Sequence, residues 1–337
     1  MLTERSGAVV ILPRVNPPAA PTPSSPDWES LAVAFLGPVG TFTEEALLTQ
    51  PDLARAKLVA MPTFSAVITA VEHGDADLGF VAIENAIEGT VNVTQDTLAF
   101  DADLLVQREV VLPIHLALMA RPGTTIDQVT HVWSYPHALA QCRKYLEREL
   151  PAVDTDATNS TAAAARMLAE RDDVHGAAIA PVRAAEVYGL DVLAHPIEDH
   201  DDNATRFVLV AREGIPAPTG HDKTSIVVFQ RADEPGSLLA ILQEFAARGI
   251  NLTKLESRPT RKGLGDYCFL IDLEGHLRDE VVADALRSLK AKHTDVKFLG
   301  SYPAAGDHGP AVRLEVQEAE RRADDWIAGL RDAIDLG

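Results

Sequence analysis

Four short segments carry hydroxyl, amide and carboxylate side chains at points where the chain is expected to turn. Three of them stand just ahead of expected helices, where hydroxyls and free backbone N–H groups bind anions. Together they predict an anion-binding cleft, although each segment alone is better explained as an ordinary helix N-cap. The segments are Gly37-Pro38-Val39-Gly40-Thr41-Phe42, Ile83-Glu84-Asn85, Ser134-Tyr135-Pro136-His137-Ala138 and Asn159-Ser160-Thr161.

A fifth polar segment, 199–207, ends in the triplet Thr205-Arg206-Phe207, at the start of an apolar stretch. Its acidic first half contains His200, so it offers oxygen ligands and one imidazole within a few consecutive residues. No second cluster stands at a known ligand spacing. A solvated acidic loop is therefore favoured over a metal site.

The elements that would position these segments alternate between strand and helix through residues 31–211. This alternation predicts an α/β domain with mostly parallel strands, and open α/β sheets bind ligands at such strand and helix ends. Strands are expected at 31–36, 58–60, 78–83, 116–120 and 177–179, and helices from 43 and at 64–73, 138–150 and 160–170.

A different pattern follows a linker rich in proline, glycine and charge at 212–222. Its order is βαββαβ, which predicts a ferredoxin-like domain over 223–303. The tail, 304–337, is expected to contain an amphipathic helix, because Trp326, Ile327, Leu330 and Ile334 recur at helical spacing. Expected strands are 224–230, 252–258, 266–273 and 296–302, expected helices are 237–248 and 278–292, and a hairpin is expected at 259–265.

Composition excludes several classes of protein. The chain has 337 residues and a net charge of −20, which argues against a nucleic-acid partner. No apolar run reaches the roughly 20 residues needed to cross a bilayer, so no membrane association is expected. Residues 1–30 are proline-rich and lack the layout of a secretion signal, which indicates a disordered leader on a cytoplasmic protein. Cys142 and Cys268 fit no metal spacing and are expected to be buried thiols.

The polar segments, taken together, resemble the prephenate dehydratase family. The resemblance rests on Thr205-Arg206-Phe207, the Gly-Pro-x-Gly-Thr-Phe loop at 37–42, Ile83-Glu84-Asn85, and the Ser-x-Pro-x-Ala-x-x-Gln-Cys stretch at 134–142. These motifs occur in that family's order and at its approximate spacing, and the resemblance covers roughly 32–302.

The resemblance implies a catalytic domain over 31–211 that is similar in shape to type 2 periplasmic binding proteins, with the active site between two lobes. One lobe would contain about 31–110 with 204–211, and the other 111–203. The chain would cross between lobes near 110–113 and return near 203–207.

The family converts prephenate to phenylpyruvate, water and CO2 without a metal or an organic cofactor. Aromatisation of the ring supplies the driving force, so the protein must hold a dianion and help the ring hydroxyl to depart. The resemblance places Thr205 beside that hydroxyl as a positioned hydrogen-bond donor or relay. Glu84 is a candidate proton source if burial raises its pKa, and His137 and His200 are weaker candidates.

Arg206 suits a carboxylate because its fork makes two parallel hydrogen bonds, and we expect it to hold the pyruvyl carboxylate. An arginine that pins its own loop to the domain is an equally good explanation. The remaining residues that the resemblance assigns to substrate binding are Thr41, Phe42, Asn85, Ser134, Asn159, Ser160, Thr161 and Phe207.

Two motifs in the second domain resemble the phenylalanine-sensing motifs of the ACT domain. They are Gly236-Ser237-Leu238-Leu239, which departs slightly from the usual Gly-Ala-Leu-Val, and Glu256-Ser257-Arg258-Pro259. The resemblance implies phenylalanine as an allosteric effector and a homodimer or homotetramer. Without it, the Pro-Gly pair before the helix would be an ordinary turn.

Three other functions remain to be weighed. A dehydratase for arogenate, in which an ammonium replaces the keto group of prephenate, uses the same reaction type and is not distinguished by the sequence. A non-catalytic sensor with the same fold would leave the Thr205-Arg206 pair unexplained. A regulated dehydrogenase would need a Gly-x-Gly-x-x-Gly turn, which the chain lacks.

Overall fold

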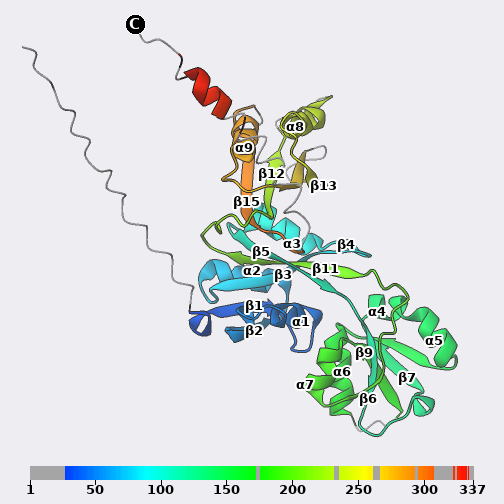
Figure 1. Ribbon diagram of the computed structural model, residues 1–337. Coiled ribbons are helices and arrows are strands. Elements are labelled where there is room, and N and C mark those ends of the chain that lie inside the picture. Colours follow the sequence, from blue (N-terminus) through cyan, green and yellow to red (C-terminus); the bar gives the residue numbers. More distant parts are fainter. Residues whose placement is uncertain are drawn as a thin grey trace, which may run out of the picture.

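The computed structural model describes residues 27–171, 175–230, 235–260, 266–292, 295–306, 322, 325–331 and 333. These residues form three sheets, two in a pair of lobes and one in a domain that stands on the first lobe (Figure 1). Nearly all of the predicted leader, the centre of the predicted hairpin at 259–265 and much of the tail lie outside the described residues. Among the described residues, no helix combines the length and the apolar character needed to cross a bilayer.

Lobe 1 is built on a six-stranded sheet in the order β2-β1-β3-β11-β5, with β4 paired to β3. The first three strands are parallel, and β11 is antiparallel to both of its neighbours. The strands are β1 (Ala32–Leu36), β2 (Lys57–Met61), β3 (Leu78–Asn85), β4 (Gly89–Thr90), β5 (Leu105–Pro113) and β11 (Ala204–Ala211). Its helical segments are η1 (Trp28–Ser30), α1 (Phe42–Leu48), η2 (Leu53–Arg55), α2 (Phe64–His73), α3 (Asn92–Asp96) and η3 (Thr97–Asp101).

Lobe 2 is a five-stranded sheet in the order β10-β6-β9-β7-β8. Its strands are β6 (Ala117–Ala120), β7 (His131–Ser134), β8 (Asp154–Ala157), β9 (Gly176–Ala180) and β10 (Asp191–Ala194). Its helical segments are η4 (Ile126–Gln128), α4 (Pro136–Gln141), α5 (Arg143–Glu149), α6 (Thr161–Glu170) and α7 (Val182–Tyr188). Two connections join the lobes, from β5 to β6 and from β10 to β11.

The third sheet has the order β13-β14-β12-β15, in which every pairing is antiparallel. Its elements follow the chain order βαββαβ, so the ferredoxin-like prediction is confirmed along with the α/β class of the lobes. The expected mostly parallel pairing of the lobes is wrong, because four of their described strand pairs are parallel and five are antiparallel. They are β12 (Asp222–Phe229), α8 (Ser237–Ala246), β13 (Leu252–Pro259), β14 (Tyr267–Glu274), α9 (Glu280–Lys292) and β15 (Asp295–Pro303). In the tail, residues 325–331 are helical, and Trp326 and Leu330 are 65% and 50% exposed.

The direction in which β11 points its side chains decides the layout of lobe 1. Val208 and Val210 belong to the apolar cluster under α2, whereas Phe207 and Leu209 belong to the cluster under α1. This is the period-two alternation of a strand that is covered on both faces. It follows that neighbouring residues at the start of β11 also face opposite sides of the sheet.

Candidate functional site

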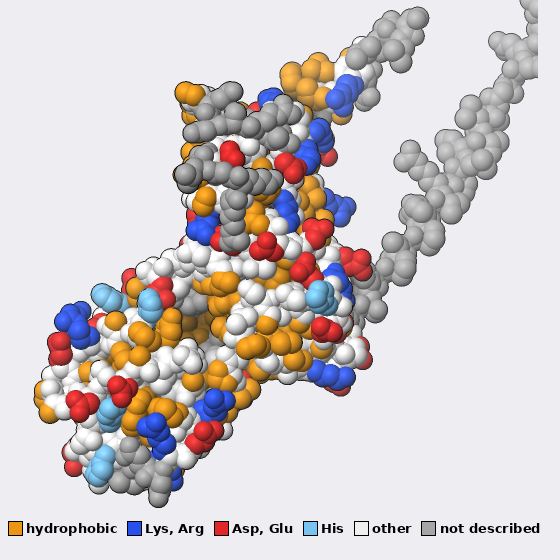
Figure 2. All heavy atoms as spheres, turned by 180° about the vertical axis from the view of Figure 1, so that it is seen from behind, with side chains coloured by type: hydrophobic (Ala, Val, Ile, Leu, Met, Phe, Trp, Pro, Cys, Tyr) orange, Lys and Arg blue, Asp and Glu red, His pale blue; other side chains and the backbone are white. Residues whose placement is uncertain are grey.

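The four predicted polar segments all stand at strand ends, and the first of them lies at the junction between the lobes. Residues 37–41 follow β1, Asn85 ends β3, residue 135 follows β7, and residues 158–160 follow β8. The lobes touch across this junction, because Tyr188 on α7 donates to the Val39 carbonyl at 2.8 Å. In Figure 2, apolar side chains gather on the surface where the lobes meet.

Thr205 lies at the start of β11, opposite Asn85 on β3. The Asn85 side-chain oxygen accepts from the backbone N–H groups of Ile87 and Glu88, each at 2.9 Å. This fixes the amide, so that its Nδ2 donates to the Thr205 hydroxyl oxygen at 2.9 Å and to Asn203 Oδ1 at 2.9 Å. Because the Thr205 oxygen already accepts a hydrogen bond, its own proton is free to be donated elsewhere.

A chain of polar contacts runs from this pair to lobe 2. Asn203 Nδ2 donates to Gln141 Oε1 at 3.2 Å, and Gln141 Nε2 donates to Glu88 Oε1 at 3.4 Å. His137 Nδ1 lies 3.0 Å from the same Glu88 oxygen. Asn203 and Gln141 fall inside segments that the sequence singled out, although neither was assigned a role. No pattern in the sequence indicated Glu88.

The loop before α1 forms another contact between the lobes. Thr41 caps α1, since its Oγ1 accepts from Glu44 N at 3.3 Å, and it also donates to the Leu36 carbonyl at 3.1 Å. Phe42 is partly buried and packs against the apolar clusters of both lobes. Gly40 approaches α7 so closely that a Cβ there would lie 3.1 Å from Ala184 Cα.

Several predicted substrate-binding residues have structural roles in this arrangement. Ser134 is fully buried and donates to the Ile179 carbonyl at 2.6 Å, and Ser160 caps α6 by accepting from Ala163 N at 3.0 Å. Thr161 is buried in the first turn of α6, and Asn159 beside it is exposed. Phe207 is 1% exposed and stacks on Phe80 at a centroid distance of 5.2 Å, so it supports the sheet and does not line the cleft.

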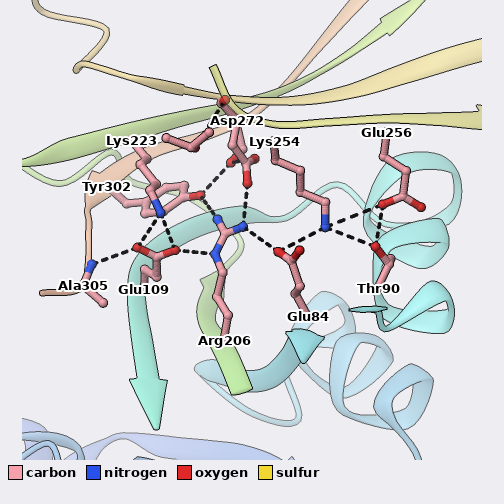
Figure 3. A network of polar contacts seen from close by, with 12 residues as sticks. Glu84, Thr90, Glu109, Arg206, Lys223, Lys254, Glu256, Asp272, Tyr302 and Ala305 are labelled. Atoms are coloured by element: carbon pink, nitrogen blue, oxygen red, sulfur yellow. Dashed lines mark hydrogen bonds and ion pairs between the residues drawn. The ribbon is translucent and has the colours of Figure 1, made fainter. Parts of the chain in front are cut away.

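Arg206 and Glu84 require a correction. Both were expected beside Thr205, but each directs its side chain to the other face of the sheet, as strand alternation requires (Figure 3). Arg206 NH1 lies 2.6 Å from Asp272 Oδ2 on β14 and 3.5 Å from Glu84 Oε2. Glu84 also pairs with Lys254 on β13 at 3.4 Å. The expected roles in carboxylate binding and proton donation are therefore not supported for these two side chains.

Two charged side chains, Glu45 on α1 and Arg183 on α7, each have a buried polar atom at the junction between the lobes. One carboxylate oxygen of Glu45 and the Nε of Arg183 are buried without a hydrogen-bond partner among the described residues. Burial raises the pKa of the Glu45 carboxyl, and His115 partly offsets this effect. Arg183 also lies 3.6 Å from the Glu44 carboxylate of the opposite lobe.

The third sheet carries a cavity of about 490 Å³ on the side of α8. It contains five of the eight residues predicted to bind an effector, namely Gly236, Ser237, Leu238, Leu239 and Ser257. Glu256 and Arg258 face the opposite side of β13, and Pro259 ends that strand. The other residues that line the cavity are Gln230, Leu242, Tyr267 and Phe269.

Comparison with known proteins gives consistent matches. The family model for prephenate dehydratase matches residues 33–215, and that for the ACT domain matches 224–291. A prephenate dehydratase from Amycolatopsis methanolica is 42% identical over 306 residues, which cover 89% of this chain and 97% of that protein.

Two solved structures are similar to this chain over most of its length. Prephenate dehydratase from Arthrobacter aurescens in complex with L-Phe is 41% identical with a TM-score of 0.78, and the match covers 90% of this chain and 100% of that one. A structure described as a quorum quenching acylase is 30% identical with a TM-score of 0.75, over 81% of this chain and 98% of that one.

Proposed function

This chain belongs to the prephenate dehydratase family, and from that premise we propose that the junction between its lobes converts prephenate to phenylpyruvate. One proton enters the reaction. The ring C–O bond breaks and the hydroxyl leaves as water, while the bond to the ring carboxylate breaks and its electron pair completes the aromatic ring. The products are phenylpyruvate, water and CO2.

The observation that carries the proposal is the hydrogen bond from Asn85 Nδ2 to Thr205 Oγ1, at 2.9 Å. It holds the Thr205 oxygen as an acceptor and leaves the Thr205 proton free for the departing ring hydroxyl. A donor that is already oriented costs no reorganisation when charge develops on the leaving oxygen. Thr205 is too weak an acid to give up its proton fully, so it positions the leaving group while another acid supplies the proton.

The contacts support His137, one of the two weaker candidates for the proton source, over Glu84. The Glu84 carboxylate is engaged by Lys254 and Arg206 on the far face of the sheet. The polar chain from Thr205 leads instead to Glu88 and His137, which lie 3.0 Å apart. In our proposal this titratable pair replenishes the proton, with water completing the path.

The surroundings suit a substrate that is part ring and part anion. Val39, Ile87 and Tyr135 come from three loops that border the junction and are 42%, 47% and 39% exposed. Such side chains can cover the carbon ring of the substrate. Arg183, whose side chain is 34% exposed and pairs with Glu44 and Glu186, lies at the same junction and in our proposal receives one of the two carboxylates.

The test is phenylpyruvate formation from prephenate, followed by ultraviolet absorbance. We expect Thr205→Ala to lower kcat by about 10²–10³-fold, the usual cost of removing one positioned donor. Thr205→Ser should recover most of the activity because it keeps the hydroxyl. Thr97→Ala is the matched control, since the Thr97 hydroxyl donates to the Val93 carbonyl of the preceding helix, α3, at 2.7 Å. Near-normal turnover by a folded Thr205→Ala protein would contradict the proposal.

The same assay addresses the related substrate. Arogenate carries an ammonium where prephenate has a keto group, and no contact among the described residues favours either side chain. Faster turnover of arogenate than of prephenate would reassign the substrate and leave the roles of Asn85 and Thr205 unchanged.

We further propose that phenylalanine occupies the cavity beside α8 and regulates the enzyme. Leu238, Leu239 and Leu242 offer an apolar lining for its ring, and Gln230 Nε2 donates to Ser237 Oγ at 2.7 Å beside it. Leu239 and Tyr267 line the cavity yet are 58% and 41% exposed, which supports a second copy covering this edge in a homodimer or homotetramer. The proposal includes a cytoplasmic location, and light scattering of the purified protein tests the assembly.

A further inference from the structure

The ACT sheet rests on lobe 1 through the face that its helices leave open. Val227, Cys268 and Leu270 on that face form an apolar cluster with Ala99 of lobe 1. At its edge, β15 crosses β5 at Gly300, where an added Cβ would lie 2.6 Å from the Val106 carbonyl oxygen. The two domains therefore meet in backbone contact, with no room for an intervening layer.

Arg206 is at the centre of the polar part of this contact (Figure 3). Its side chain is 12% exposed, and its guanidinium pairs with Glu109 of its own lobe and reaches Asp272 at 2.6 Å and the Tyr302 hydroxyl at 3.1 Å in the ACT sheet. Ser225 then joins the last two, through Oγ distances of 2.5 Å to Asp272 and 2.6 Å to Tyr302.

Further ion pairs reinforce both ends of the contact. Lys223 of the ACT sheet lies 2.9 Å and 3.1 Å from the two oxygens of Glu109, which is itself 4% exposed. On β13, Arg258 makes bonds of 2.8 Å to both carboxylate oxygens of Asp96 at the end of α3. Glu256 accepts from the Thr90 hydroxyl of β4 at 2.6 Å.

The strands that make these contacts also form the wall of the effector cavity. On β13, Ser257 lines the cavity, while its neighbours Glu256 and Arg258 reach lobe 1. On β14, Phe269 lines the cavity, and Asp272 on the opposite face holds Arg206. Since side chains alternate along a strand, any shift of these strands caused by a bound amino acid is passed directly to the contact.

We propose that Arg206 is a positioning residue that fixes the start of β11, and with it Thr205, according to the state of the ACT sheet. The inference rests on the proposed function, in which Thr205 acts on the substrate and phenylalanine fills the cavity. Arg206 touches no substrate in this scheme. Thr205 and Arg206 are adjacent on β11, but Thr205 faces the junction between the lobes and Arg206 contacts the ACT sheet. A movement of the ACT sheet on effector binding therefore alters the orientation of the Thr205 hydroxyl.

The electrostatics of the contact favour movement as a unit. Burial opposes ionisation of Asp272, but the charge of Arg206, the hydrogen bonds from Ser225 and Arg206, and the charge of Lys254 together outweigh it, so the pKa of the Asp272 carboxyl lies below its usual value. Separating the pair would leave the buried Asp272 carboxylate without its ion-pair partner, whereas Arg206 would keep Glu109. The domain interface therefore shifts together with β11 and does not slide past it.

Asp272→Asn and Tyr302→Phe test the inference in the full-length protein. For each protein we would measure kcat and KM for prephenate with and without saturating phenylalanine, and phenylalanine affinity by calorimetry. Both variants should bind phenylalanine within about twofold of the parent. The effector-induced change in kcat/KM, typically about 5–150-fold in such systems, should fall below about twofold in Asp272→Asn and to an intermediate value in Tyr302→Phe.

Arg287→Gln is the matched control, because its ion pair with Asp284 at 2.9 Å lies on the exposed side of α9. It should respond to phenylalanine as the parent does. If Asp272→Asn does not fold, Tyr302→Phe decides the matter, since it removes one hydroxyl and keeps the ring.

An undiminished effector response in folded variants would overturn the inference. So would loss of phenylalanine binding in Tyr302→Phe, because the cluster would then serve the cavity and not the coupling. The proposed function fails in a different way, through a parent protein that does not turn over prephenate or does not bind phenylalanine.

Discussion

At the scale of single residues, the ionised carboxylate of Glu45 is in an unfavourable environment at the junction between the lobes. It stands in the first turn of α1, and one of its carboxylate oxygens is buried without a hydrogen-bond partner among the described residues. Burial raises the pKa of this carboxyl, and the nearby charge of Glu186 adds to the effect, against the opposing charges of His115 and Arg183. The ionised form is therefore destabilised in the folded protein.

The sign of the pH dependence follows from this direction. Because the folded pKa lies above the ordinary value of 4.5, the folded state is favoured when Glu45 is protonated. Stability is lost as pH rises from 4.5 through the folded pKa, and the full cost is present above that folded pKa. Glu45→Gln, which cannot ionise, should raise the melting temperature at pH 7 and give no advantage below pH 4.5.

Thermal unfolding followed by circular dichroism across this pH range measures the effect. Glu147→Gln is the control, since the Glu147 side chain is 63% exposed in a surface pair with Arg143. A melting temperature at pH 7 that is equal to or lower than that of the parent would contradict the expectation.

Residue types alone predicted part of the candidate site. The motifs around Asn85 and Thr205 predicted side chains that the structure brings within 2.9 Å. The structure directs Arg206 and Glu84 away from Thr205, which chemical type alone could not predict, and Arg206 fits the alternative of an arginine that fixes its own segment to the domain. Once residues 204–211 are known to form a strand, alternation sends Thr205 and Arg206 to opposite faces, and the location of Asp272 decides what Arg206 meets.

At the scale of elements, the crossing of β15 over β5 sets how the two domains fit. Gly300 has a φ of +146°, a conformation that residues with side chains rarely adopt, and it faces the Val106 backbone at close range. A side chain there would push the strands apart. The close approach of these two elements therefore depends on one glycine.

Gly300→Ala should destabilise the protein by about 1–3 kcal/mol, through overpacking together with backbone strain. Gly306→Ala is the matched control, because Gly306 also has a positive φ, +86°, but a Cβ there would meet nothing within 4 Å. Urea unfolding of the two variants separates the cost of the clash from the cost of the dihedral. Equal losses of stability would show that the crossing tolerates a side chain.

Element order was predictable, whereas some boundaries were not. The alternation of apolar runs gave the α/β lobes, and the βαββαβ pattern gave the ACT sheet. The expected helix at 138–150 is divided, because Cys142 has a non-helical conformation, with φ −111° and ψ 14°, between α4 and α5. Cys142 is fully buried, and contacts from distant segments that fix such a residue are not encoded in local periodicity.

At the scale of the whole molecule, the effector cavity and the catalytic junction belong to different domains of one chain. A ligand that binds only the folded state stabilises it by RT ln(1 + [L]/Kd), about 2.7 kcal/mol at a hundredfold excess over Kd. Phenylalanine at that excess should therefore raise the melting temperature by several degrees.

Differential scanning fluorimetry with increasing phenylalanine measures this shift. Lysine is the control amino acid, because its ammonium is poorly suited to the lining formed by Leu238, Leu239 and Leu242. No shift at millimolar phenylalanine, or an equal shift with lysine, would contradict the assignment of the cavity.

The contact between Arg206 and Asp272 also limits how the gene can be recombined. The two matched families meet between residues 215 and 224, which invites the joining of one relative's catalytic half to another's regulatory half. Glu109 and Arg206, however, lie on the catalytic side of this boundary. Their partners Lys223, Asp272 and Tyr302 belong to the ACT sheet. A chimera in which one half lacks its charged partner at this contact would leave a buried charge without an ion pair. The two halves must therefore carry complementary residues at these positions.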